Sequence, residues 1–186
     1  MTKALWIYPL VVCAAIAVAL ARGPNHAPVY TADGGIAKPD YRKWVFLGSG
    51  LGMSYTGHGE GNPPFTNVFA EPSAYDQYMH NGVWPDKTVL VAERRASATT
   101  LSINKSGFAQ VGDALGAEIE VKDASRGGWL FFEVPPGASS GKLLPKSAAC
   151  YDCHQQHAAV DNTFVQFYPS LIEIAKRKGT YRQSID

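Results

Sequence analysis

The middle of the chain alternates between apolar and polar residues, which is the pattern of β-strands with one buried face. Turn-forming residues at 102–105 and 123–128 separate the alternating segments. The alternation predicts strands at residues 65–70 (FTNVFA), 88–93 (TVLVAE), 107–112, 117–123 (AEIEVKD) and 129–134 (WLFFEV). These strands, joined by short turns, predict an antiparallel sheet.

Helical signals flank this section. Pro39-Asp40 predicts a short helix through YRKWVFL, because proline suits the first helical turn. The glycine-rich and proline-rich residues 48–64 then predict a loop. Ser73 is predicted to cap a second short helix, which ends at Asn81-Gly82.

From Ser147 the pattern becomes helical to the end of the chain. CYDCHQQHAA predicts one helix, and FVQFYPSLIEIAKRKG predicts another, with Pro169 as an alternative start for the second. Basic residues 176–178 precede Gly179, as suits a helix C-terminus. Strands in the centre with helices gathered mainly after them predict an α+β fold.

The N-terminus has the pattern of a secretory signal peptide. Lys3 precedes a long apolar run, and Ala19-Leu20-Ala21 supplies the small residues of a cleavage site. We therefore expect a signal peptide at 1–21 and an exported, periplasmic protein; a retained membrane anchor is the alternative. Residues 22–38 are expected to form a flexible leader, and residues 39–186 a single domain.

Composition narrows the class of protein. The formal net charge of the 186 residues is +1, so no basic face for nucleic acid is expected. The chain has three cysteines, of which Cys13 falls in the signal peptide. The remaining pair, Cys150 and Cys153, is too close in sequence to hold a fold together, and must serve a local site.

That pair belongs to the pentapeptide CYDCH, a haem attachment motif. On a helix, two intervening residues bring both thiols to one edge of a porphyrin, where each forms a thioether with a vinyl group. The next residue, His154, then places its imidazole below the iron. The sequence thus predicts one covalent haem c, held by Cys150 and Cys153, with His154 as an axial iron ligand.

Three other interpretations compete for the motif. A thioredoxin-like redox pair would follow a strand in a βαβ unit, which the pattern lacks. A zinc site needs four ligands; Cys150, Cys153 and His157 could supply three, but there is no second Cys/His pair, and His154 is too close to Cys153 to ligate easily beside it. A chance match is the third alternative.

The sixth coordination position of the iron, opposite His154, distinguishes an electron-transfer cytochrome from a ligand-binding one. Electron-transfer cytochromes fill that position with Met or His. No candidate has a spacing that marks it as a ligand. An open position is therefore favoured. The candidates are His26, Met53, His58, Met79, His80 and His157.

Several segments stand in a recognisable order: YRKWVFLG, FTNVFAEPSAYDQY, WPDKTVLVAE, GWLFFEV and CYDCHQQHAAVDNTFVQFYPSL. Together they resemble the cytochrome P-460 family, which includes the c′-beta cytochromes. The resemblance covers about residues 40–175, and it is most specific at CxxCH and the D-x-x-F-x-x-F-Y-P element after it.

This resemblance implies a homodimeric periplasmic protein with a five-coordinate haem packed between the sheet and the CxxCH helix. The P-460 type oxidises hydroxylamine and has its haem cross-linked to a lysine on the strand that corresponds to DKTVLVAE. The c′-beta type lacks that bond, has an apolar distal pocket, and binds nitric oxide and carbon monoxide.

The chain departs from the P-460 type at this strand. Ala92 stands where the resemblance places the lysine, and Lys87 should point to the opposite face. Glu93 and Glu133 would face the haem only if the strand facing is inverted. The predicted distal pocket is Phe69, Leu90, Ala92, Phe131 and Phe132.

The sequence therefore favours a protein that binds nitric oxide or another small gas over an enzyme, and it assigns no catalytic residue. The first alternative is a hydroxylamine-oxidising cytochrome P-460. The second is an electron-transfer cytochrome with a cytochrome as its redox partner.

Overall fold

The computed structural model describes residues 27–54 and 60–183. The predicted signal peptide, the first residues of the leader, and two candidate ligands, His26 and His58, lie outside these ranges. Within the described ranges, none of the helices is both long and apolar enough to cross a membrane.

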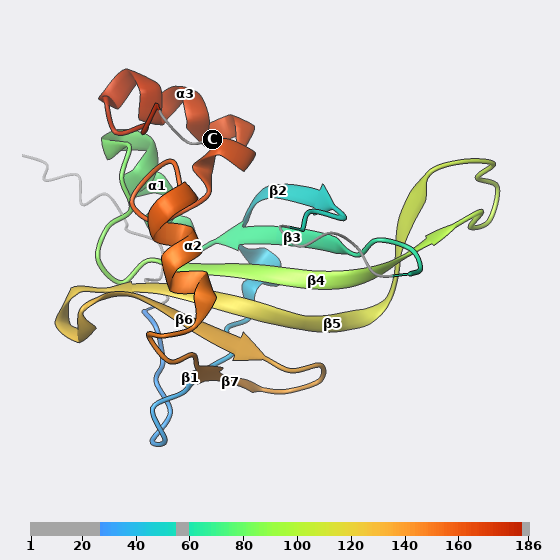
Figure 1. The fold of residues 1–186 in the computed structure, drawn as a ribbon, viewed down its shortest axis with the longest axis horizontal. Coiled ribbons are helices and arrows are strands. Elements are labelled where there is room, and N and C mark those ends of the chain that lie inside the picture. Colours follow the sequence, from blue (N-terminus) through green and yellow to red (C-terminus); the bar gives the residue numbers. More distant parts are fainter. Residues whose placement is uncertain (1–26, 55–59, 184–186) are drawn as a thin grey trace, which may run out of the picture.

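The described chain is organised around one seven-stranded sheet, in which every neighbouring pair is antiparallel (Figure 1). The strand order is β1-β7-β6-β5-β4-β3-β2. The strands are β1 (Ile36–Ala37), β2 (Val45–Leu51), β3 (Phe65–Ala70), β4 (Val89–Thr99), β5 (Phe108–Asp123), β6 (Gly128–Val134) and β7 (Ser140–Leu143).

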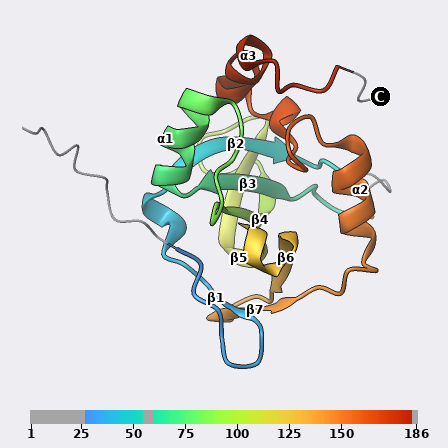
Figure 2. The same cartoon turned by 90° about the vertical axis from the view of Figure 1, so that its left-hand side faces the viewer.

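Three α-helices lie together on one side of this sheet (Figure 2). They are α1 (Pro72–Asn81), α2 (Ala149–His157) and α3 (Pro169–Lys178); short 3-10 helices occupy Tyr41–Lys43, Ala124–Arg126 and Val165–Phe167. An antiparallel sheet with helices gathered on one side confirms the predicted α+β fold. Pro169 is the true start of the last helix, and Gly82 and Gly179 end α1 and α3 with positive φ, as predicted.

The predicted helix over YRKWVFL is wrong, and the loop predicted at 48–64 begins only after Leu51 in the described residues. Only Tyr41–Lys43 form a 3-10 turn, and β2 then runs through the glycines. Pairing with β3 explains this, because Val45 to Leu51 complete the edge of the sheet.

Two further predictions are corrected at element ends. Glu71, and not Ser73, is the N-cap of α1, and its carboxylate accepts a hydrogen bond from the Ala74 amide at 2.8 Å. The two strands predicted at 107–112 and 117–123 are one long strand, β5. Beyond Arg95, β4 pairs only with β5, so the two strands project as an arm (Figure 1).

The two faces of the sheet have separate cores. The face under the helices, called the helix face below, includes Leu90 and Phe131. The opposite face, called the sealed face, includes Val91 and Phe132 and is covered by chain from the N-terminal side. Residues that alternate along a strand therefore enter different cores.

The N-terminal segment that covers the sealed face belongs partly to the predicted flexible leader. Within residues 27–38, Tyr30 and the strand β1 are packed against the rest of the molecule, whereas Ala27 and Val29 are exposed. Ile36 is buried in β1, and the Tyr30 hydroxyl donates to Asp123 at 2.7 Å. The segment is ordered because the sealed face would otherwise expose its apolar side chains to water.

Candidate functional site

Helix α2 carries the three residues of the predicted site. It begins at Ala149, so Cys150 and Cys153 are three residues apart and share one helical face. Both are free thiols and partly buried. Burial raises the pKa of the Cys150 thiol above its ordinary value. The helix therefore presents two adjacent thiols beside the helix face of the sheet.

His154 follows directly and is held in one orientation. Its Nδ1 lies 2.8 Å from the backbone oxygen of Asn162, and a carbonyl can only accept, so Nδ1 carries the proton and donates. Aromatic rings of Phe131 and Phe164 pack against the imidazole, with ring centroids 4.5 and 4.4 Å away. The ring is fixed, and its Nε2 keeps a lone pair for a metal.

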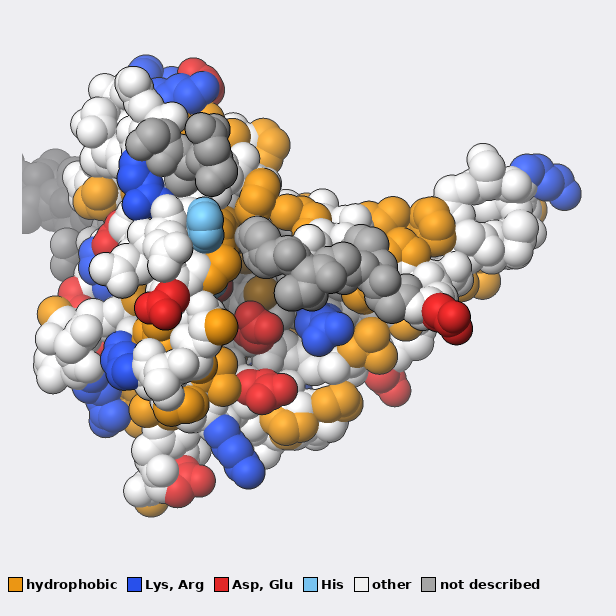
Figure 3. Space-filling model, viewed as in Figure 1, with side chains coloured by type: hydrophobic (Ala, Val, Ile, Leu, Met, Phe, Trp, Pro, Cys, Tyr) orange, Lys and Arg blue, Asp and Glu red, His pale blue; other side chains and the backbone are white. Residues whose placement is uncertain are grey.

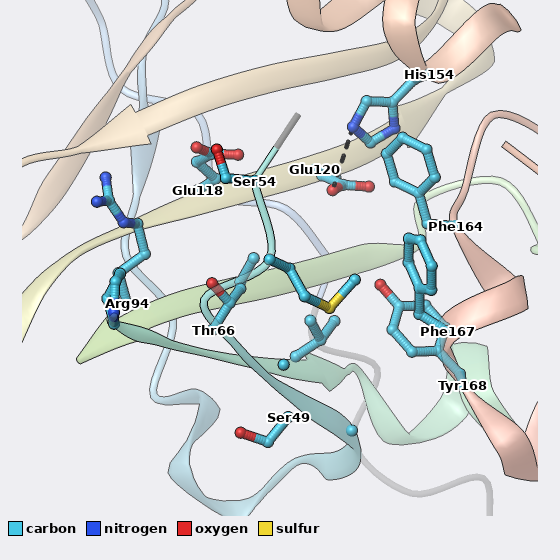
Figure 4. Close-up of a pocket in the computed structure, with 16 residues that line it drawn as sticks. Ser49, Ser54, Thr66, Arg94, Glu118, Glu120, His154, Phe164, Phe167 and Tyr168 are labelled. Atoms are coloured by element: carbon cyan, nitrogen blue, oxygen red, sulfur yellow. Dashed lines mark ion pairs between the residues drawn. The ribbon is translucent and has the colours of Figure 1, made fainter. Parts of the chain in front are cut away.

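His154 borders a cavity of about 570 Å³, a size typical of ligand and cofactor sites. Strands β2 to β5 form one wall, and the 3-10 turn before α3 forms another (Figure 4). The lining residues are Gly48, Ser49, Gly50, Met53, Ser54, Pro64, Thr66, Val68, Ala92, Arg94, Glu118, Glu120, His154, Phe164, Phe167 and Tyr168.

The two walls differ in chemistry. Phe164, Phe167 and Tyr168 make one wall aromatic, whereas β4 and β5 contribute Arg94, Glu118 and Glu120 to the other (Figure 4). In the space-filling view, acidic, basic and apolar side chains lie together over the strands beside α2 (Figure 3). The cavity thus combines an apolar side with charged groups.

Glu120 is the charged group nearest the imidazole. Its Oε1 lies 3.9 Å from Nε2 of His154, and its side chain is 13 % exposed. Burial raises the pKa of the Glu120 carboxyl, while interaction with His154 acts in the opposite direction. A carboxyl group in this position can hold or release a proton close to the imidazole.

The predicted distal residues fall in three places. Ala92 lines the cavity. Leu90 and Phe131 are on the helix face but do not line the cavity, although Phe131 contacts His154. Phe69 and Phe132 pack in the core of the sealed face. Glu93 is also buried on that face, and Glu133 is exposed.

Sequence reasoning missed the charged wall, because the wall depends on the register of two strands. Ala92 pairs with Glu118 across β4 and β5, and Leu90 pairs with Glu120. Paired residues point to the same face. With this register, the facing of Leu90 and Ala92 places Glu118 and Glu120 on the same side, whereas alternation alone suggested that they faced solvent.

Of the candidate sixth ligands that the structure describes, Met53 alone lines the cavity, and it is half-exposed. Met79 packs against the core of the helix face. Nδ1 of the exposed His80 lies 2.7 Å from the Asp76 carbonyl oxygen, and His157 is an exposed residue at the end of α2.

No lysine is among the described residues that line the cavity. Lys87, the lysine nearest to Ala92 on this segment, forms an ion pair with Asp123 and lies 3.3 Å from the Ser125 hydroxyl. Asp123 is also bonded to Tyr30 of the N-terminal segment. Lys87 is therefore engaged away from the cavity.

These residues fit a haem c. Two thiols lie on one face of a helix, an imidazole offers its Nε2, and a cavity of suitable size adjoins them. When bound, haem would supply an iron able to bind small ligands or exchange electrons. Within the described ranges no three His, Cys, Asp or Glu side chains gather as a site for a metal ion.

Comparison with known proteins supports the same assignment. No curated protein matches the chain. The sequence profile of the family described as Cytochrome P460, a family of c-type haem proteins, matches residues 38–165, from just before the first 3-10 turn to the segment after α2. This match covers more than half of the chain and includes Cys150, Cys153 and His154. The chain therefore belongs to the Cytochrome P460 family.

Proposed function

We propose that this protein is a mono-haem c cytochrome that binds nitric oxide or a similar small gas. Cys150 and Cys153 attach the haem, His154 is its one protein ligand, and the opposite coordination position is open. The observation that carries the choice is Ala92. It lines the cavity where the resemblance places a cross-linking lysine, and its side chain can form no such bond.

The surroundings of His154 support a five-coordinate haem. Phe131 and Phe164 hold the ring, and the Asn162 carbonyl fixes which nitrogen is protonated. Phe164 and Phe167 form an apolar wall that disfavours water. A fixed imidazole on one side and a partly apolar cavity suit a neutral diatomic ligand.

The absorption spectrum of the reduced protein, with and without carbon monoxide, tests this proposal. We expect a high-spin c-type spectrum that shifts on adding carbon monoxide. Met53→Leu is the matched control, because it keeps the volume of the one described candidate ligand in the cavity but removes its sulfur. A low-spin spectrum that becomes high-spin in Met53→Leu would contradict the open position and support electron transfer.

Hydroxylamine oxidation is the second candidate function, and the charged wall favours it. That oxidation releases protons and electrons, and Glu118 and Glu120 are carboxyl groups in the cavity able to accept the protons. Steady-state turnover with hydroxylamine and an artificial electron acceptor separates the two functions. Rapid turnover in the wild type that falls sharply in Glu120→Gln would contradict gas binding as the function and support hydroxylamine oxidation.

We also propose that the protein is exported to the periplasm, with the signal peptide removed after Ala21. The apolar run and the Ala19-Leu20-Ala21 pattern support this. The intact mass of the protein from a periplasmic extract checks the cleavage site. A polypeptide that retains Met1 and stays with the membrane fraction would support the anchor instead.

We also propose that the protein is a homodimer and that the β4–β5 arm forms part of the interface between the two copies. A two-stranded ribbon is marginally stable alone, and this one exposes Leu101, Ile103 and Phe108 near its tip. Sedimentation velocity of the wild type and of Ile103→Asp tests the assignment. We expect a dimer that dissociates in the variant; a wild-type monomer would contradict it.

A further inference from the structure

The carbonyl that accepts the hydrogen bond from His154 belongs to an unusual turn, residues 160–163. Asp161 and Asn162 both have left-handed backbone angles, with φ of 47° and 59°. Two reciprocal backbone hydrogen bonds close the turn, from Thr163 N to Val160 O at 2.7 Å and from Val160 N to Thr163 O at 3.3 Å. Consecutive left-handed residues other than glycine persist only where their surroundings hold them.

Asp161 connects this turn to the sheet. Its Oδ2 accepts from Lys122 Nζ at 2.6 Å, and its Oδ1 accepts from Trp129 Nε1 at 3.4 Å. Lys122 is on β5 and Trp129 on β6, so the carboxylate spans two neighbouring strands. The turn is therefore fixed at its tip to a rigid part of the molecule.

The other end of the turn is held through Trp84. Its indole Nε1 donates to the Thr163 hydroxyl at 2.8 Å, and that hydroxyl donates to the Val160 carbonyl at 2.6 Å. Lys122 also donates to the backbone oxygen of Trp84 at 2.7 Å. One lysine thus joins both supports of the turn, and the Asn162 carbonyl between them has little freedom to move.

We infer that Asp161 is a positioning residue for the haem, acting through the Asn162 carbonyl on His154. The inference rests on the proposed function only in requiring that His154 ligates the iron. A firmly held carbonyl keeps a strong hydrogen bond from Nδ1–H, which makes Nε2 a stronger donor to iron and fixes the ring plane. Without Asp161, the turn relaxes and the carbonyl rotates away from Nδ1.

A purely structural ion pair does not explain this arrangement as well. The side chains of Lys122 and Asp161 are 26 % and 29 % exposed, so water partly screens the pair and reduces its contribution to stability. The ion pair instead holds the turn at 160–163, whose Asn162 carbonyl accepts the hydrogen bond from His154. A structural role predicts a lower unfolding free energy alone, whereas a positioning role predicts a changed iron–histidine bond.

The experiment measures the iron–histidine stretching band of the ferrous haem by resonance Raman spectroscopy, together with the reduction potential. Asp161→Asn keeps the left-handed preference but weakens the hold on Lys122. Lys122→Met removes the same ion pair from the other side. Glu173→Gln is the matched control, because it removes one carboxylate charge from an exposed lysine pair on α3.

For Asp161→Asn and Lys122→Met we expect a stretching band at lower frequency and a higher reduction potential. The ratio of ferric to ferrous haem at a fixed potential should fall by up to about tenfold, or about 59 mV for one electron. Glu173→Gln should match the wild type. Asn162→Gly keeps the left-handed turn and should also match it, whereas Asn162→Val should resemble Asp161→Asn.

Unshifted bands and potentials in Asp161→Asn and Lys122→Met would overturn the inference, even if both variants are less stable. Carbon monoxide binding is recorded on the same samples. A wild type that binds carbon monoxide, with unshifted variants, contradicts the positioning role alone. A wild type that fails to bind it, with shifted variants, contradicts gas binding alone.

Discussion

Two carboxylates lie on opposite faces of the same sheet, Glu93 fully buried and Glu120 with 13 % of its side chain exposed, and their surroundings differ sharply. Glu93, on the sealed face, has a hydrogen bond from the Tyr41 hydroxyl at 2.6 Å and one from Arg95 Nε at 2.7 Å, with Arg42 as a further ion-pair partner. Glu120, on the helix face, has the imidazole Nε2 of His154 at 3.9 Å as its nearest polar neighbour from the helices.

Their pKa values move in opposite directions for this reason. Burial alone would raise the pKa of Glu93, but the hydrogen bonds from Tyr41 and Arg95 and the two arginine charges lower it overall. Burial raises the pKa of Glu120, and interaction with His154 offsets this only in part. A fully bonded carboxylate stabilises the fold, whereas a poorly bonded one in a cavity is a candidate for chemistry.

The largest expected effect comes from removing the thiols on the helix face. In Cys150→Ser/Cys153→Ser the protein should carry no covalent porphyrin, because serine forms no thioether. Intact-mass spectrometry after acid–acetone extraction measures this directly. The sealed face should keep its structure, so the strand signal in circular dichroism is the control. A haem mass that survives on the double variant would contradict the attachment sites.

Acid should have the next largest effect, because it removes two bonded carboxylates at once. Burial would raise the pKa of Asp123, but hydrogen bonds from Lys87, Ser125 and Tyr30 lower it, and the pKa of Glu93 is lowered too. The unfolded chain therefore binds protons first as pH falls. The stabilisation is complete above about pH 5, beyond the usual pKa values of these groups, and is lost as pH falls through the lowered folded values.

Urea unfolding at several pH values and constant ionic strength measures this loss. Glu93→Gln is the comparison, since one of the two groups no longer titrates in it. We expect the free energy of unfolding to fall less steeply with acid in the variant than in the wild type. Equal slopes would show that the arginines around Glu93 do not lower its pKa.

The sequence located the motif and the Ala92 facing because both depend on local rules. CxxCH is a fixed spacing on a helix, and alternation along β4 put Leu90 and Ala92 on one face. The same rule fails on β6. Trp129 to Phe132 are four consecutive buried residues, so no alternation distinguishes the face of Phe131 from that of Phe132.

Other features depend on contacts distant in sequence. Phe164 and Phe167 have helical spacing, but a 3-10 turn at Val165–Phe167 breaks that helix and both rings line the cavity. Asp161 and Asn162 form a left-handed turn without glycine, and the bonds from Trp84, Lys122 and Trp129 that hold it come from other elements. No sequence pattern within residues 160–163 predicts these hydrogen bonds.

Glu93→Gln tests the sealed face alone. The variant leaves Arg42 and Arg95 without their carboxylate, and Arg95 is largely buried. We expect the free energy of unfolding at pH 7 to fall by about 2–3 kcal/mol, below the range of about 3–5 kcal/mol for a fully buried pair because Arg42 reaches solvent. The control is Glu133→Gln, an exposed glutamate of β6. The haem spectrum should not change in either variant.

Glu120→Gln should have the smallest effect on stability and completes the comparison. The carboxyl is only partly buried and has few partners, so a neutral amide of the same shape should change the free energy of unfolding by less than about 1 kcal/mol. Its effect should appear in ligand binding instead, because the charge faces the cavity beside His154. We expect carbon monoxide association, measured by flash photolysis, to change by about threefold to tenfold, a range that corresponds to about 0.7–1.4 kcal/mol. A large loss of stability with an unchanged rate of carbon monoxide association would mean that Glu120, like Glu93, serves the fold. The difference between the two carboxylates would then no longer identify the cavity as the functional site.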